Sequence, residues 1–167
     1  SMKTVLVTGS TDGIGVTTAK NLAAKGYNVL IHGRSQPRID SAASVVRKFA
    51  AESSWSSSSS DESTSTTTSS TVYELPPVDI STVQGCRELA RHVKQTCDDN
   101  GLQLTVLMNN AGVYSEELVR TEDGLEQTFA VNVMATFVMT SLLLGTLLRQ
   151  PKSRIVIASS ISQCQSI

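Results

Sequence analysis

The sequence has little charge and no excess of either sign. Its 167 residues carry 14 Lys and Arg against 15 Asp and Glu, a net charge of −1. Without a basic field to gather phosphate backbones, the composition argues against nucleic-acid binding by bulk electrostatics. Three cysteines with no Cys-x-x-Cys pair, and no secretory signal, indicate a reducing, cytoplasmic setting. Neither of the two histidines has partners at metal-ligand spacing, so we expect no metal site.

Charge is absent from one long stretch, residues 127–148. Such a run is long enough to cross about 30 Å of hydrocarbon. It nevertheless contains Asn132, Thr136 and Thr140, which are four residues apart and therefore lie on one stripe of a helix. A polar stripe on an apolar helix favours a buried helix that faces a site or a partner, so we expect no membrane span.

The chain alternates short apolar, β-branched runs with segments of helical periodicity. Strands are predicted at residues 3–8, 28–31, 72–75, 104–108 and 155–158. Ile14, Thr18 and Leu22 recur at helical spacing in the first helix, and Pro37 starts the second. This order predicts one α/β domain over residues 1–167, a doubly wound parallel sheet with helices on both faces.

The third helix carries two of the cysteines. Ser81 and Gln84 have the spacing of a capping box, which predicts that the helix starts there. One of its faces gathers apolar residues, namely Cys86, Leu89, Ala90, Val93 and Cys97. The two cysteines lie about 16 Å apart along a straight helix, so we expect them to be core residues that cannot pair.

Residues 53–71 have a different composition. Sixteen of these 19 residues are Ser or Thr, and the others are Trp55, Asp61 and Glu62. Such a tract cannot bury enough apolar surface to offset its chain entropy, so we expect a disordered insertion in a surface loop. A phosphorylated regulatory loop is the alternative.

A glycine-rich turn, residues 8–15, follows the first predicted strand and opens the first helix. Gly9 permits a tight turn, Gly13 lets the backbone approach a pyrophosphate, and Gly15 allows close packing of the helix on the strand. The helix N-terminus then offers unpaired N–H groups to phosphates. The alternative is a tight strand-to-helix turn without a ligand.

The chain resembles the N-terminal portion of the short-chain dehydrogenase/reductase family. The family pattern T-G-x-x-x-G-x-G matches residues 8–15, and N-N-A-G matches residues 109–112. Three further family elements match in order: an adenine-contacting Asp at Asp79, a helix Asn at Asn132, and the I-V-x-x-S-S strand end at residues 155–160. The resemblance implies a Rossmann-type fold that binds NAD(P). Residues 109–144 also show a weak similarity to its retinol-dehydrogenase-like branch.

The end of the second strand addresses the choice of cofactor. Members that prefer NAD place an acid there for the ribose 2′-hydroxyl, but residues 31–37 contain no carboxylate and instead offer Arg34 and Ser35. A cation and a small hydroxyl suit a 2′-phosphate, which favours NADP(H) over NAD(H). Arg34 as a solvated surface charge is the alternative. The cofactor-binding residues we expect are Gly9, Ser10, Thr11, Asp12, Gly13, Ile14, Gly15, Arg34, Ser35, Asp79, Ile80, Asn110, Ala111 and Gly112.

The resemblance also implies catalytic residues. Ser160, favoured over Ser159 by register, would hydrogen-bond the substrate oxygen, and Asn132 would support a water relay. The family's acid/base pair, Tyr-x-x-x-Lys, starts at none of the three tyrosines, Tyr27, Tyr73 and Tyr114. We therefore expect this chain to be the cofactor-binding front of a longer enzyme, without the family's C-terminal strands.

Two classes of function follow. The first is an NADP(H)-dependent oxidoreductase that acts on a small carbonyl or alcohol, with a lipophilic substrate hinted at by the branch similarity. The second is a dinucleotide-binding protein without catalysis, serving as a sensor or partner module. A fragment that neither folds nor binds is a third reading. In the enzyme, residues 125–148 would form the contact of a homodimer or tetramer, as that helix commonly does in the family.

Overall fold

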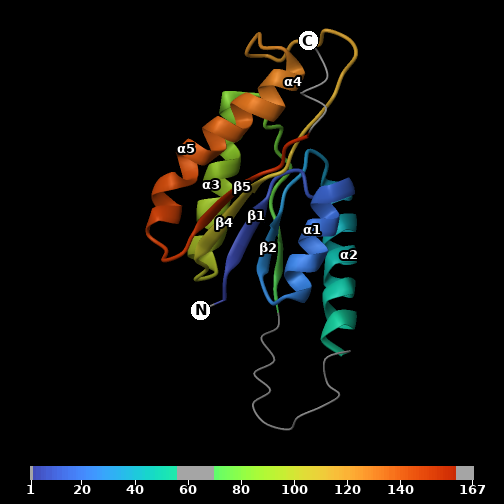
Figure 1. Ribbon diagram of the computed structural model, residues 1–167, viewed down its shortest axis with the longest axis vertical. Helices are drawn as coiled ribbons and strands as arrows, with labels where there is room; N and C mark the ends of the chain where they lie inside the picture. The colour runs from blue at the N-terminus through green and yellow to red at the C-terminus, as the bar shows by residue number, and fades with distance from the viewer. Residues whose placement is uncertain (1, 56–69, 161–167) are drawn as a thin grey trace.

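The computed structural model describes residues 2–55 and 70–160, which form a parallel sheet between two layers of helices (Figure 1). The strands are β1 (Thr4–Val7), β2 (Asn28–Ile31), β3 (Val72–Glu74), β4 (Leu104–Asn109) and β5 (Arg154–Ile157). They are arranged in the order β3-β2-β1-β4-β5, and all four neighbouring pairs are parallel. The predicted Rossmann-type α/β fold is confirmed.

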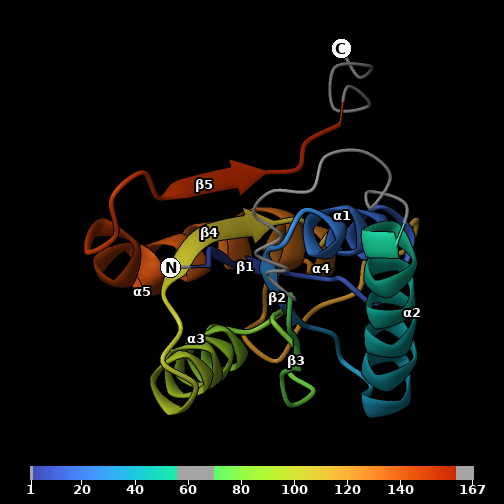
Figure 2. The same cartoon turned by 90° about the horizontal axis from the view of Figure 1, so that it is seen from below.

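The helices cover the two faces of the sheet in separate pairs. On one face lie α1 (Gly13–Ala24) and α2 (Gln36–Trp55), and on the other lie α3 (Val83–Asp99) and α5 (Ala135–Leu148). Figure 2 shows the two pairs on opposite sides of the strands. Immediately before α5, the chain forms the short helix α4 (Gln127–Phe129) and a π-helical segment, Ala130–Met134.

Each central strand supplies side chains to both layers, because successive residues of a strand point to opposite faces. In β1, Val5 and Val7 are buried with α1 and α2, whereas Leu6 is buried with α3 and α5. Every residue of β1 and β2 is buried, which explains why three of the four residues in each strand are apolar. Strand β5 lies at the edge of the sheet, and its four residues are exposed.

The helix predicted from the spacing of Ile14, Thr18 and Leu22 is present as α1. Of these residues, Leu22 packs against the core, whereas Ile14 is 73% exposed. The fully buried residues of α1 are the small ones, Gly15, Ala19 and Ala23. They also recur at helical spacing, one position further along the chain.

The start of α3 is also shifted by one residue from the prediction. The N-cap is Thr82, whose hydroxyl accepts a hydrogen bond from the Gly85 N–H at 3.0 Å. Ser81 precedes the cap as a buried residue, and its N–H donates to Asp79 Oδ1 at 2.9 Å.

The two cysteines of α3 occupy the core, as predicted. Both are free thiols, and burial raises the pKa of Cys86 to about 12 and that of Cys97 to about 11. The thiolate is therefore strongly disfavoured at both positions, which makes them unreactive core residues.

Helix α2 is longer than predicted, since it continues through Trp55. Residues 53–55, the first three of the Ser/Thr-rich tract, are therefore helical rather than part of a disordered loop. Residues 56–69 lie outside the described residues.

The uncharged stretch forms one continuous helical run, Gln127–Leu148. Within the described residues it is the one helix long and apolar enough to cross a membrane, with 28% of its most apolar 18-residue window buried. Its inner face, Ala135, Met139, Leu143 and Leu147, packs in the core beside α3. Phe137 and Leu148 on the outer face are 72% and 73% exposed. Length and composition alone are weak grounds for a membrane span.

The orientation of α5 can be tested with two consecutive leucines. Leu143 is fully buried and Leu144 is 41% exposed. We expect Leu143→Ala to lower the free energy of unfolding by about 2–5 kcal/mol, because it leaves a cavity in the core. Leu144→Ala makes the same chemical change and is expected to cost less than about 1 kcal/mol. Urea unfolding measures both, and equal losses would contradict this orientation.

Candidate functional site

The candidate site lies where the strand order reverses. From β1 the chain proceeds to β2 and β3 on one side, and β4 then joins the other side of β1. In open parallel sheets this switch point leaves a crevice beyond the carboxyl ends of the strands. The loops that follow β1 and β4 meet there, and they carry the glycine-rich turn and the N-N-A-G segment.

The glycine-rich turn has the backbone geometry that its sequence predicts. Gly9 and Gly13 have φ angles of +63° and +50°, in the left-handed region that favours glycine. A Cβ at Gly13 would meet nothing within 4 Å, so the backbone there faces open space. A Cβ at Gly15 would collide with the Gly9 carbonyl oxygen and lie 2.6 Å from Asn110 Nδ2. Gly15 thus permits close packing of α1 against both loops.

The side chain of Thr8 joins the two loops. Its hydroxyl oxygen accepts hydrogen bonds from the backbone N–H groups of Asn110 and Ala111, both at 3.0 Å. Asn110 Nδ2 in turn donates to the carbonyl oxygens of Thr8 and Gly9, at 3.0 and 3.1 Å. A Cβ at Gly9 would lie 2.9 Å from Ala111 Cα. Asn110 and Ala111 therefore fix the shape of the turn.

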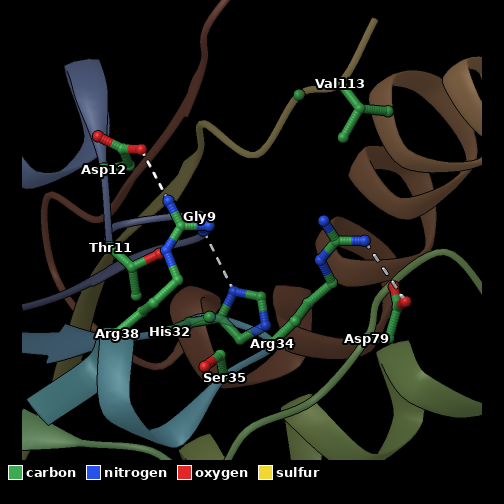
Figure 3. A pocket seen from close by; sticks show the side chains of 11 residues that line it. Gly9, Thr11, Asp12, His32, Arg34, Ser35, Arg38, Asp79 and Val113 are labelled. Atoms are coloured by element: carbon green, nitrogen blue, oxygen red, sulfur yellow. Dashed lines mark hydrogen bonds and ion pairs between the residues drawn. The ribbon is translucent and has the colours of Figure 1, made fainter. Parts of the chain in front are cut away.

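A cavity of about 550 Å³ opens beside this turn (Figure 3). Its volume falls in the usual range of small-molecule and cofactor sites. The residues that line it come from the loops after β1, β2, β3 and β4 and from the start of α2: Gly9, Thr11, Asp12, His32, Gly33, Arg34, Ser35, Arg38, Asp79, Gly112 and Val113. Seven of the expected cofactor-binding residues are among them.

Two arginines in the cavity are each paired with an aspartate (Figure 3). Arg38 donates to Asp12 Oδ2 at 2.8 Å, and Arg34 lies 3.7 Å from Asp79 Oδ2. The Arg34 and Asp79 side chains are 56% and 51% exposed, so this looser pair is open to solvent and to a ligand. Asp12 also caps α1, because its Oδ1 accepts from the Gly13 N–H at 2.7 Å.

His32 lies at the end of β2, beneath the turn, and is 2% exposed. Its Nδ1 accepts a hydrogen bond from the Gly9 N–H at 3.1 Å, and its Nε2 lies 3.1 Å from the Val78 carbonyl oxygen. Burial lowers the pKa of His32 from 6.5 to about 4, a shift that the Val78 hydrogen bond and Asp79 oppose and Arg34 reinforces. The imidazole is therefore neutral at physiological pH.

Asp79 is positioned by tight packing at the start of α3. A Cβ at Gly85 would collide with the Asp79 carbonyl oxygen, so glycine is required for the helix to approach this loop. No motif in the sequence marks Gly85, because its close approach to the Asp79 carbonyl exists only in the folded chain.

The other expected cofactor-binding residues lie outside the cavity lining. Ser10 is buried, and its hydroxyl accepts from the His32 N–H at 2.9 Å. Ile80 is a core residue that is 4% exposed. Gly13, Ile14, Gly15, Asn110 and Ala111 form the turn and its support. Conversely, the structure adds His32, Gly33, Arg38 and Val113, for which the sequence offered no motif.

The polar stripe of the long helix does face the N-N-A-G loop. Asn132 Oδ1 accepts from the Val113 N–H at 2.9 Å, and its Nδ2 donates to the Val113 carbonyl at 3.0 Å. Thr140 accepts from Asn109 Nδ2 at 3.1 Å. Asn132 lies in the π-helical segment, a distortion that is frequent at functional sites. Neither Asn132 nor Ser160, an exposed residue beyond the end of β5, lines the cavity.

The segment Asp123–Glu126 holds the helices around the site together. Asp123 Oδ2 accepts from the Val83 N–H at the start of α3, at 2.7 Å. Glu126 accepts from the N–H groups of Thr128 and Phe129, at 2.7 and 2.6 Å, and these bonds lower the pKa of its carboxyl. Glu126 is thus the N-cap of α4, and Asp123 binds a free N–H group at the start of α3 from a distant part of the chain. Within residues 2–55 and 70–160, no three His, Cys, Asp or Glu side chains gather where they could hold a metal ion.

The sequence of this chain is similar to those of known proteins. The family model described as short chain dehydrogenase matches residues 3–75 and 60–166. Retinol dehydrogenase 14 of Mus musculus is 35% identical over 159 residues, which cover 95% of this chain and 44% of that protein. Polyprenol dehydrogenase of Homo sapiens is 32% identical over 145 residues, 87% of this chain and 37% of that protein. The chain thus spans less than half the length of both relatives.

Solved structures share the fold. L-Sorbose reductase from Gluconobacter frateurii, complexed with NADPH and L-sorbose, superimposes with a TM-score of 0.73 at 22% identity. The match covers 99% of this chain and 55% of that one.

The packing of the turn can be tested at two helical glycines. We expect Gly15→Ala to lower the free energy of unfolding by about 1–3 kcal/mol, because its Cβ would collide with the Gly9 carbonyl. Gly145→Ala, in an exposed position of α5 with nothing within 4 Å, is expected to be neutral or to stabilise by up to about 1 kcal/mol. Urea unfolding compares the two. A stabilising Gly15→Ala would contradict the described packing.

Proposed function

This chain belongs to the short-chain dehydrogenase family, and we propose from that premise that it forms the dinucleotide-binding part of an NADP(H)-dependent oxidoreductase. The reaction would transfer a hydride between the nicotinamide and a carbonyl or alcohol substrate. The observation that carries the proposal is the glycine-rich turn, which is locked to the N-N-A-G loop beside a cavity of about 550 Å³.

The residues present fit a dinucleotide. The N-terminus of α1 offers backbone N–H groups and the positive end of its dipole, and Gly13 leaves the approach to it open. Asp12 would place a negative charge beside a pyrophosphate, but its ion pair with Arg38 offsets that charge. Asp79 and Arg34 lie on the β2–β3 side of the cavity, where the adenosine half would be held.

The preference for NADP(H) rests on the cations near the end of β2. Arg34 and Ser35 line the cavity, and residues 31–37 offer no carboxylate for a ribose 2′-hydroxyl. Arg38, one turn into α2, adds a second guanidinium to the same wall. Guanidinium groups bind phosphate through charge-assisted hydrogen bonds, which suits a 2′-phosphate.

The chemistry of hydride transfer belongs to the nicotinamide cofactor when it is bound. We propose that Ser160 hydrogen-bonds the substrate oxygen. Asn132 would support the proton relay and, through its two hydrogen bonds to Val113, would fix the loop that lines the cavity. The Tyr-x-x-x-Lys pair that completes the family's acid/base chemistry does not occur within these 167 residues.

A second candidate function is dinucleotide binding without catalysis, in a sensor or partner module. The features described above support it, because they form a dinucleotide site and none of them depends on an acid/base residue. The two candidates differ in turnover and not in affinity.

We propose a lipophilic alcohol or carbonyl compound as the substrate class. The names of the retinol and polyprenol dehydrogenases both specify apolar alcohols, and these relatives are 35% and 32% identical to this chain.

We also propose a homodimer or tetramer formed through residues 125–148, where Phe137 and Leu148 are exposed. The cysteine usage supports a cytoplasmic location.

Cofactor selectivity is tested by Arg34→Asp in the natural protein. The change removes a phosphate ligand and introduces a carboxylate that can accept from a ribose hydroxyl. We expect NADPH affinity to fall about 10- to 100-fold, with a much smaller change for NADH. Lys94→Asp, the same charge reversal on the exposed side of α3, is the control. Calorimetric titration measures both cofactors, and equal losses would contradict the assignment.

Catalysis is tested by comparing the 167-residue chain with the natural protein. We expect the chain to bind NADPH without oxidising it in the presence of a carbonyl substrate, since it contains no Tyr-x-x-x-Lys. The intact mass of the natural protein shows whether further residues exist, and NADPH absorbance follows turnover. Ser160→Ala in a longer, active protein is expected to lower kcat by about 10²-fold or more. Binding without turnover in the natural protein would favour the second candidate function.

A further inference from the structure

His32 contacts two parts of the cofactor site that are distant in the sequence. It follows β2, while its imidazole lies between the Gly9 turn after β1 and the Val78 loop after β3 (Figure 3). The ring is 2% exposed and lines the cavity with Gly9 and Asp79. The proposed hydride transfer assigns no role to the His32 side chain, although it is buried at the wall of the cavity.

The contact with the glycine-rich turn involves both the side chain and the backbone. The Gly9 N–H donates to His32 Nδ1 at 3.1 Å, and the Ser10 N–H donates to the His32 carbonyl at 3.0 Å. The Ser10 hydroxyl accepts from the His32 N–H at 2.9 Å. The imidazole therefore holds Gly9, the first glycine of the turn, in its conformation with φ at +63°.

His32 contacts the loop that carries Asp79 through a hydrogen bond to Val78. His32 Nε2 lies 3.1 Å from the Val78 carbonyl oxygen, and the Val78 N–H donates to the Gly33 carbonyl at 3.0 Å. Val78 directly precedes Asp79, which lines the cavity opposite the turn. One side chain thus connects the phosphate-binding turn to the loop that carries Asp79.

One protonation state satisfies both contacts. Nδ1 must be unprotonated to accept from Gly9, and Nε2 must carry the proton to donate to Val78. A second proton would set an Nδ1–H against the Gly9 N–H, donor against donor. Arg34 and Asp79 are the charged groups that act on the ring, and Arg38 and Asp12 line the same cavity.

We propose that His32 is a positioning residue of the dinucleotide site, whose neutral imidazole holds the glycine-rich turn in its binding conformation and couples it to the Asp79 loop. The inference rests on the proposed function. Its consequence is that cofactor affinity depends on a hydrogen-bond acceptor at the position of Nδ1, beyond any contribution of His32 to stability.

Two variants separate the contacts of the ring. His32→Asn keeps an acceptor near the position of Nδ1, and His32→Gln keeps a donor near the position of Nε2. We expect His32→Asn to retain NADPH affinity within about threefold and His32→Gln to lose about tenfold, because the partly buried Gly9 N–H is then left without its partner. His32→Phe, which has neither group, is expected to bind at least as weakly as His32→Gln.

Calorimetric titration of NADPH at neutral pH, with each variant in the natural protein, gives these affinities. Thermal unfolding of the same samples identifies any variant that is not folded. Among folded variants, the inference is tested by the difference in NADPH affinity between His32→Asn and His32→Gln. Equal affinities of His32→Asn and His32→Gln would overturn the inference. If the wild type itself does not bind NADPH, the proposed function fails instead.

The neutral imidazole is tested by the pH dependence of folding. Because the pKa of His32 is lowered on folding, the unfolded chain binds the proton first, and stability falls as the pH decreases from 6.5 towards 4. We expect the folding equilibrium constant of the wild type to fall up to about tenfold per pH unit relative to His32→Asn. The variant shares all carboxylates with the wild type, so the ratio isolates the imidazole. A ratio independent of pH would contradict a neutral, buried ring.

Discussion

The hydroxyl group of Thr8 is the contact on which the site depends. Its oxygen accepts hydrogen bonds from the backbone N–H groups of Asn110 and Ala111. The side-chain amide of Asn110 donates to the carbonyl oxygens of Thr8 and Gly9. These bonds join the loop that follows β1 to the loop that follows β4, beside the open cavity. Positions 9 and 15 require glycine because the two loops lie so close together. A Cβ at Gly9 would lie 2.9 Å from Ala111 Cα, and a Cβ at Gly15 would collide with the Gly9 carbonyl oxygen.

Around this contact the charges of the cavity are balanced in pairs. Arg38 with Asp12 and Arg34 with Asp79 set two cations beside two anions, and the buried His32 remains neutral between them. The Arg38–Asp12 pair is a hydrogen-bonded contact of 2.8 Å, whereas the Arg34–Asp79 distance of 3.7 Å leaves both groups open to a ligand. Under the proposed function, an anionic dinucleotide would contact Arg34 and would disrupt only this long ion pair with Asp79.

The sequence predicted the elements better than it predicted the faces of those elements. Alternating strands and helices fixed the fold class, and the apolar face of α3 was predicted from its periodicity, including Cys86 and Cys97. In α1 the spacing of Ile14, Thr18 and Leu22 predicted the helix, but its fully buried residues are the small ones, Gly15, Ala19 and Ala23. Hydrophobicity cannot identify a face that is selected for close approach. The cap of α3 is Thr82 and not Ser81, because the Thr82 hydroxyl is the group that accepts from the Gly85 N–H.

The sequence by itself determined the parallel α/β fold, the glycine-rich turn and the residues that match the family, since these depend on local conformation and on patterns along the chain. The tertiary structure decided which side chains meet. His32 and Arg38 belong to no motif, and their roles arise from contacts with Gly9 and Asp12, on segments separate in sequence. Such contacts depend on the order of the strands in the sheet, because it brings the ends of β1, β2, β3 and β4 to a common edge.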